Sequence, residues 1–286
     1  AGALERSGQS ITALFEQGRY AEFSLGSVSP DTSGNAVAGL GGFGSGDITP
    51  SYFQFGAAYK ADINDQLSYA LIYDQPYGAD IAYPAGTGYF AAGSTAEFES
   101  HALTGLLRYK FPNNFSVHGG LRLQTIEASA AIPFIANYRV NGDRDFGVGY
   151  VAGMAYEHPD IALRVSLTYS SAISYDVDTV ETSLALGGPN RSTTEVDTPQ
   201  SINLEFQTGI APDTLLFGGL RWIDYTDFTI RPANYATLTG GGSLLSYNDD
   251  VYAWSLGVGR RLNDTWSVSA SLGYETSNGG FATNLG

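Results

Sequence analysis

The sequence has no cysteine, few charged residues and no long apolar run, and each of these absences excludes a class of protein. Without cysteine there can be no disulfide framework, thiol nucleophile or thiolate metal site. The 14 Lys and Arg are outnumbered by 29 Asp and Glu, and the formal net charge of −15 opposes nucleic-acid binding. No segment approaches the ~18–20 consecutive apolar residues of a transmembrane helix, which excludes a helical membrane protein.

Glycine and aromatic residues are abundant instead, with 36 Gly, 19 Tyr, 15 Phe and 3 Trp among 286 residues. Aromatic side chains favour β-strands, so this composition indicates a large β protein. The length fits one or two soluble domains or a single barrel. Residues 1–6 lack a basic and apolar export signal, so we expect that any such signal has been removed.

Polar and apolar residues alternate in segments of about ten residues, the length of a tilted strand that crosses a bilayer. In the clearest segment, every second residue from Phe53 to Tyr59 is aromatic or alanine, and Lys60 lies on the other face. The chain turns at residues 64–65 and the alternation returns over 67–73, which predicts a hairpin. A strand over 20–28 and four more hairpins bring the total to about eleven strands, with the hairpin turns at 112–114, 158–160, 211–213 and 263–264.

The connections between hairpins are long and are expected to be irregular, at 75–95, 127–145, 171–196 and 226–248. Short turns therefore alternate with long loops, as in outer-membrane barrels, whose periplasmic turns are tight. A soluble β-sandwich has no reason to separate its connections in this way. We expect an all-β chain that forms a transmembrane antiparallel β-barrel.

Three arginines test this assignment, because an arginine facing lipid near the bilayer centre costs about 2–4 kcal/mol. Arg108, Arg122 and Arg164 all fall on the polar face of their strands and so should point into the barrel. Inside it, any of them could bind the carboxylate of a ligand through charge-assisted hydrogen bonds. The alternative is an internal network with Glu205 or Asp74.

Eleven is an odd number, whereas bacterial single-chain barrels close with an even number of strands. The chain also ends at 283–286 without a terminal aromatic strand. We therefore expect residues 20–286 to be a C-terminally incomplete barrel.

Six stretches share their residue pattern with one known family, at 10–16, 23–26, 70–80, 198–201, 220–224 and 255–260. Together they resemble the FadL-type outer-membrane transporters of long-chain fatty acids, which include relatives that import toluene and other aromatic hydrocarbons. The resemblance covers most of the chain. It implies a fourteen-stranded barrel in the outer membrane of a Gram-negative bacterium, with passive uptake of hydrophobic compounds.

The N-terminal region departs from that family, whose members carry an internal hatch with an Asn-Pro-Ala motif that is missing here. Residues 1–19 are too short for a full hatch, so we expect either a reduced plug in the barrel or a frayed terminus. The family is thought to release ligand sideways at a kinked strand. The comparable place here is Gln75-Pro76, because proline cannot donate to a strand ladder.

Aromatic residues of the long loops, among them Tyr77, Phe90 and Phe134, are candidates for capturing the ligand, with loop packing as the alternative. The expected partners are a hydrophobic small molecule, outer-membrane lipid and lipopolysaccharide, with no nucleic acid, and the chain is expected to be monomeric. We expect no cofactor or metal, because the three histidines lack a metal-binding spacing.

Enzymatic activity is not expected, because acid pairs such as Glu97 with Glu99 lie in or beside the long loops and are better explained as solvated carboxylates. Two other functions remain open from the sequence. One is a general diffusion porin for hydrophilic solutes, and the other is a structural or adhesive barrel.

Overall fold

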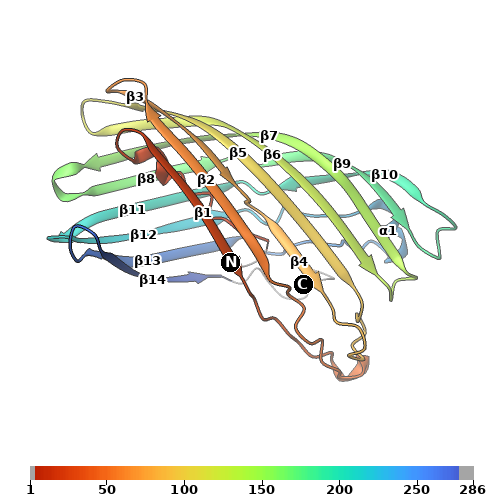
Figure 1. Cartoon of the computed structure of the whole chain (residues 1–286). Helices are drawn as coiled ribbons and strands as arrows, with labels where there is room; N and C mark the ends of the chain where they lie inside the picture. The colour runs from red at the N-terminus through yellow and green to blue at the C-terminus, as the bar shows by residue number, and fades with distance from the viewer. Residues whose placement is uncertain (1–3, 277–286) are drawn as a thin grey trace.

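The computed structural model describes residues 4–276, and all fourteen of the strands found there belong to one antiparallel sheet that curves around an interior (Figure 1). The expectations for residues 1–3 and for the ending at 283–286 lie outside the described residues. None of the helices in the described part is long and apolar enough to cross a membrane.

The strands are β1 (Tyr20–Val28), β2 (Tyr52–Asp62), β3 (Leu67–Asp74), β4 (Gly78–Ala82), β5 (Thr95–Lys110), β6 (Phe115–Ile132), β7 (Tyr138–His158), β8 (Leu163–Ser170), β9 (Ile173–Thr182), β10 (Asn190–Thr198), β11 (Ser201–Ala211), β12 (Thr214–Ile223), β13 (Val251–Arg261) and β14 (Ser267–Glu275). Four short helical turns accompany them, η1 (Thr12–Phe15), η2 (Ala38–Leu40), η3 (Pro159–Ile161) and α1 (Ala233–Leu238).

Eleven strands follow one another in the hydrogen-bonded order β1-β2-β3-β5-β6-β7-β8-β11-β12-β13-β14. These are the eleven strands expected from the alternation, and the all-β antiparallel fold is confirmed. β1 and β14 form the two edges, and no pairing joins them within residues 4–276. The tight turns lie at one end of the sheet, and β4, β9, β10 and α1 lie at the other (Figure 1).

The long connections are more regular than the sequence analysis expected. β4 pairs with β5 inside the first of them, β9 and β10 form a hairpin inside the third, and β9 joins the sheet along β7. β6 and β7 continue into the second, which leaves only a short turn around 133–137. These extensions were wrongly taken as irregular because their outward residues are charged, as at Asp176 and Asp178, which hides the alternation.

The two faces of the eleven-strand path differ sharply. Outward positions are exposed and apolar, among them Phe23, Phe55, Leu71, Leu107, Leu121, Tyr150, Leu167, Leu204, Leu220, Trp254 and Leu272. On β2 to β12 many inward positions are polar and buried, among them Lys60, Ser68, Thr104, Arg108, Ser116, His118, Arg122, Gln124, Thr168, Asn203 and Arg221. An apolar outside around a polar inside fits a barrel in lipid.

The outward apolar band ends where charges begin. On β7 the last outward apolar residue towards the long connections is Phe146, and Asp143 and Arg144 beyond it are exposed. Glu127 on the neighbouring β6 is exposed as well. The ends of β5, β6 and β7 that lie nearest the long connections, together with β4, β9 and β10, therefore extend beyond the lipid band.

Candidate functional site

The N-terminal segment, residues 4–15, lies against the inward faces of the strands. Its η1 turn buries Phe15 between two of the predicted arginines, with the Arg108 and Arg164 guanidinium carbons 4.5 and 5.0 Å from the ring centroid. The His118 ring meets Phe15 edge-on at 5.8 Å. The preceding Leu14 is fully buried with the apolar inward residues of β3, β5 and β7. The aromatic ring thus covers the buried cations.

Upstream of η1, the segment is fastened by a buried ion pair. Glu5 Oε1 accepts from Arg221 Nε, and Arg221 Nη2 lies 2.6 Å from the same oxygen, with both side chains less than a tenth exposed. Arg221 also donates to Asn203 Oδ1 at 2.5 Å. Arg122 donates to Gln9 Oε1 and to Thr104 Oγ1.

The carboxylates that were expected to pair with the arginines are engaged differently. Asp74 Oδ2 accepts from Ser7 Oγ at 2.5 Å, and Glu205 Oε1 accepts from Ser10 Oγ at 2.7 Å. An internal polar network exists, but its links run largely through the N-terminal segment. Many polar groups of the lumen are therefore hydrogen-bonded by residues that are distant in sequence, while Asp74 Oδ1 and Glu205 Oε2 have no partner within residues 4–276.

The wall of strands is interrupted beside this segment. In the described residues β2 pairs with β3 only over 57–62, and β4 pairs only with β5. Residues 52–56 of β2 are therefore not paired with β4, and this gap is the break in the wall. Gln75 Oε1 accepts from the Phe55 N–H at 3.0 Å, in place of a strand partner. Pro76 O accepts from the N–H groups of Arg6 and Ser7. Gln75 and Pro76 thus lie at the break, and their role as an exit stays a prediction.

Arg6 occupies the break. Its guanidinium carbon lies 3.9 Å from the ring centroid of Tyr52 on β2, and Gln54 donates to its backbone carbonyl. On the opposite side Gly78 begins β4, and a Cβ added there would lie 2.5 Å from Arg6 Nε. Glycine is therefore needed at 78 for Arg6 to approach the wall.

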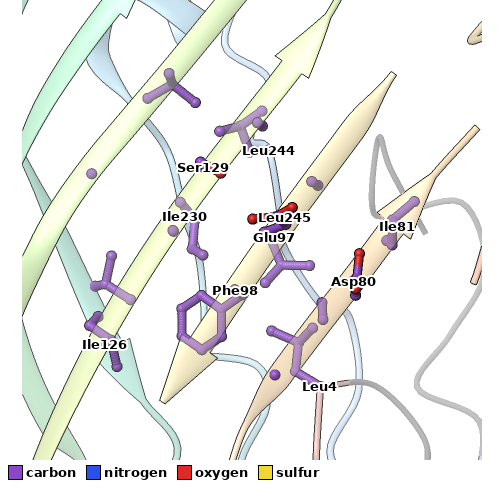
Figure 2. Close-up of a pocket in the computed structure, with 18 of the residues that line it drawn as sticks. Leu4, Asp80, Ile81, Glu97, Phe98, Ile126, Ser129, Ile230, Leu244 and Leu245 are labelled. Carbon is purple, nitrogen blue, oxygen red and sulfur yellow. The ribbon is translucent and has the colours of Figure 1, made fainter. Parts of the chain in front are cut away.

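A cavity of about 500 Å³ adjoins the segment and the break (Figure 2). Its lining comes from Leu4–Arg6, from β4 to β7, from the β9–β10 hairpin and from the loops around 30–52 and 230–247. Most lining side chains are apolar, including Leu4, Ile81, Phe98, Ile126, Val140, Val177, Val196, Ile230, Leu244 and Leu245. Both edges of the break contribute, Tyr52 from β2 and residues 78–81 from β4.

The loop between β12 and β13 forms part of the cavity wall and is fastened by Glu181 of β9. This fully buried carboxylate accepts from Tyr138 Oη at 2.7 Å and from the Tyr235 N–H at 2.8 Å. It also accepts from the N–H and the side-chain amide of Asn234. Burial alone would raise the pKa of Glu181, but these hydrogen bonds outweigh it and hold the pKa below its usual value.

The residues predicted to bind ligand do not line this cavity. Arg108, Arg122 and Arg164 belong to the network with the N-terminal segment, described above. Tyr77 is 2% exposed and packs in the same apolar cluster as Phe98, behind the lining. The exposed rings of Phe90 and Phe134 meet at 5.5 Å in the long connections. Ligand contact by any of the six stays a prediction.

Sequence reasoning did not identify the cavity residues. Phe98, Ile126, Val177 and Val196 are inward positions of strand extensions that were taken as loops or their borders. The alternation of these apolar residues with charged ones is the pattern that could have found them. As for metals, no group of His, Asp or Glu in residues 4–276 is arranged to hold an ion.

Known structures share this architecture. An FadL homologue from Pseudomonas aeruginosa superposes with a TM-score of 0.66 at 14% identity, over 91% of this chain and 71% of that one. The toluene transporter TodX of P. putida gives 0.62 at 12% identity, over 93% and 76%. The CymD monoaromatic hydrocarbon channel gives 0.54 at 11%, over 91% and 73%. Identities this low show the fold alone.

Sequence comparison is more specific. No curated protein sequence matches the chain significantly. The family described as "Outer membrane protein transport protein (OMPP1/FadL/TodX)" matches residues 28–280, nearly the whole chain. The apolar outer band and the polar inner face fit a barrel in the outer membrane, which is what this family forms. The chain belongs to the OMPP1/FadL/TodX family of outer-membrane transport proteins.

Proposed function

We propose that the protein takes up hydrophobic small molecules passively, through the cavity and then sideways through the break between β2 and β4. The observation that carries the proposal is the apolar cavity whose lining includes both edges of the break. A ligand held there has a short path to lipid that avoids the polar lumen. Long-chain fatty acids and aromatic hydrocarbons are the candidate ligands, and two solved relatives, CymD and TodX, are named as monoaromatic hydrocarbon channels, TodX also as a toluene transporter.

In this proposal residues 1–19 act as a reduced plug. The support is the set of contacts that residues 4–15 make with inward side chains, above all the Glu5–Arg221 pair and the burial of Phe15. No catalytic step is involved. We take the working unit to be a single chain, surrounded by outer-membrane lipid and lipopolysaccharide.

A substitution that fills the cavity tests whether the ligand binds there. Ala128 of β6 lines the cavity, so Ala128→Trp should remove much of its volume. Ala152→Trp on the exposed face of β7 is the matched control, because it adds the same side chain towards lipid. We expect Ala128→Trp to abolish saturable binding of radiolabelled toluene and fatty acid to the purified protein and their uptake by cells, and the control to retain both. Equal uptake by the two variants would refute the proposal.

The break is tested separately. Replacing Gln75 and Pro76 together by valine restores a backbone donor and two strand-favouring residues. We expect uptake to fall while binding in detergent stays unchanged, because only the exit is altered. Unchanged uptake would rule out a lateral exit at this place. Steady ion conductance without ligand binding would instead indicate a diffusion porin.

A further inference from the structure

We infer that the ligand of the cavity is an uncharged apolar molecule and that carboxylates are selected against. The inference rests on the proposed function of the cavity and narrows its substrate class. Three features support it, namely the few charges that face the cavity, the engagement of the arginines of the lumen and the charges on the outer face of the surrounding strands.

Few charges face the cavity. The lining residues with ionisable groups are Glu5, Arg6, Asp80, Glu97 and two tyrosines. Glu5 is neutralised by Arg221, and Arg6 is stacked on Tyr52. Asp80 and Glu97 are register partners on β4 and β5, one position away from the inward Ala79 and Phe98, so their carboxylates belong to the outer face, and neither is in an ion pair within residues 4–276. A carboxylate in the cavity would therefore find a single cation, which is already stacked, and two carboxylates close outside.

The arginines of the lumen are not available to bind the carboxylate of a ligand in the cavity. Arg108 is bound to Glu157 and to Ser116 Oγ, Arg164 donates to Gln207 Oε1 at 3.0 Å, and Arg122 and Arg221 are held by the N-terminal segment as described above. None of these four lines the cavity. Recruiting one to a ligand head group would break these bonds and leave its present partner without the cation.

The buried hydroxyls of the lining are engaged with each other, because Thr179 Oγ1 donates to Thr194 Oγ1 at 2.8 Å. Most other lining side chains are apolar. A ligand with a polar end would therefore exchange its hydration for largely apolar surroundings.

The strands around the cavity are acidic on their outer face. The exposed carboxylates there are Glu97, Glu99, Glu127, Asp143, Asp176, Asp178, Glu195 and Asp197, and the exposed cations are Arg139, Arg144 and Arg191. Arg144 is itself paired with Glu127 at 2.8 Å. The summed field repels an approaching anion and leaves a neutral molecule unaffected.

The experiment compares two pairs of radiolabelled probes that differ mainly in charge, toluene with benzoate and methyl dodecanoate with dodecanoate. Binding to the purified full chain in detergent is measured by equilibrium dialysis at pH 8, where the carboxylates are ionised. We expect the neutral member of whichever pair binds to have at least a tenfold lower Kd than the anion. Benzoate or dodecanoate binding as tightly as its neutral partner would overturn the inference and leave the proposed function intact.

A charge variant tests whether the carboxylates beside the cavity cause the weaker binding of anions. Asp80→Asn with Glu97→Gln removes the two unpaired carboxylates, and we expect it to tighten anion binding severalfold without changing neutral binding. Asp160→Asn with Asp264→Asn, in turns at the other end of the sheet, changes the net charge equally and should change neither. Anion binding that is lost in Arg6→Ala or Arg122→Ala would instead show a head-group site and overturn the inference. Binding of none of the four probes would refute the proposed function as well.

Discussion

The Glu5–Arg221 ion pair allows a quantitative prediction about the N-terminal segment. Replacing Glu5 by Gln removes the charge that neutralises Arg221 and keeps the shape of the side chain. Arg221 stays buried, with Asn203 and Ser201 as its remaining partners. Removing one member of a buried pair costs about 3–5 kcal/mol, because the other charge is left uncompensated. Residues 4–15 belong to none of the strands, so we expect this cost to weaken the docking of the segment rather than the sheet.

At the lower end of that range, the equilibrium for release of the segment changes by about a hundredfold, since each 1.4 kcal/mol corresponds to a factor of about ten. The chain has no cysteine, so one introduced thiol reports on release without interference. Ala13 is 5% exposed inside the barrel, and Ala13→Cys places the reporter there. We expect the rate of maleimide labelling of this thiol in detergent to rise about a hundredfold in Glu5→Gln, in line with that free-energy change.

Glu16→Gln is the control, because it makes the same change at an exposed position directly after the segment. A labelling rate in Glu5→Gln within a factor of about three of the control would refute the reasoning, since it would put the contribution of the pair below ~1 kcal/mol. The double variant Glu5→Gln with Arg221→Gln removes both charges and should label more slowly than Glu5→Gln alone. A cycle of the four proteins then gives the coupling energy of the pair.

Three further predictions concern other contacts. Phe15→Ala should cost about 3–5 kcal/mol of docking and expose Arg108 and Arg164, so ion conductance in planar bilayers should rise, while Phe111→Ala at an exposed turn should leave it low. Gly78→Ala should displace Arg6 from the break and speed trypsin cleavage after Arg6, whereas Gly8→Ala, where a Cβ meets nothing within 4 Å, should not. Because the pKa of Glu181 is lowered, its docking of the β12–β13 loop stabilises the fold above the ordinary value of 4.5 and is lost as pH falls through the lowered pKa. Hydrogen exchange at the Asn234 and Tyr235 amides should show protection at neutral pH that disappears in acid, and protection persisting there would contradict this assignment.

The eleven strands of the path could be predicted because the alternation of apolar and polar residues is visible within each strand separately. From Phe53 to Tyr59, for example, lipid outside and a packed lumen inside enforce a strict alternation, and Asn64-Asp65 marks the turn. Above the lipid band this constraint changes, because outward positions meet water. Asp176 and Asp178 of β9 then alternate with inward Tyr175 and Val177, and the segment reads as a polar loop.

The cavity was beyond the reach of local patterns for a different reason. Phe98, Ile126, Val196 and Leu245 come from separate parts of the chain and meet only through strand register and loop docking. The inward direction of Arg122 followed from its strand, but its partner did not. Gln9 lies 113 positions away in the chain, and nothing in its surroundings indicates that it enters the lumen.

The segment Leu4–Ser7 is bonded to two different parts of the molecule at once. Gly78 N–H donates to Leu4 O, and Arg6 and Ser7 donate to Pro76 O, while Glu5 between them holds Arg221. Consecutive residues thus contact both the side wall and the lumen, so a movement of this segment would change both attachments together. We expect opening towards lipid and loosening of the interior to be coupled, so that a variant that opens one of them also opens the other.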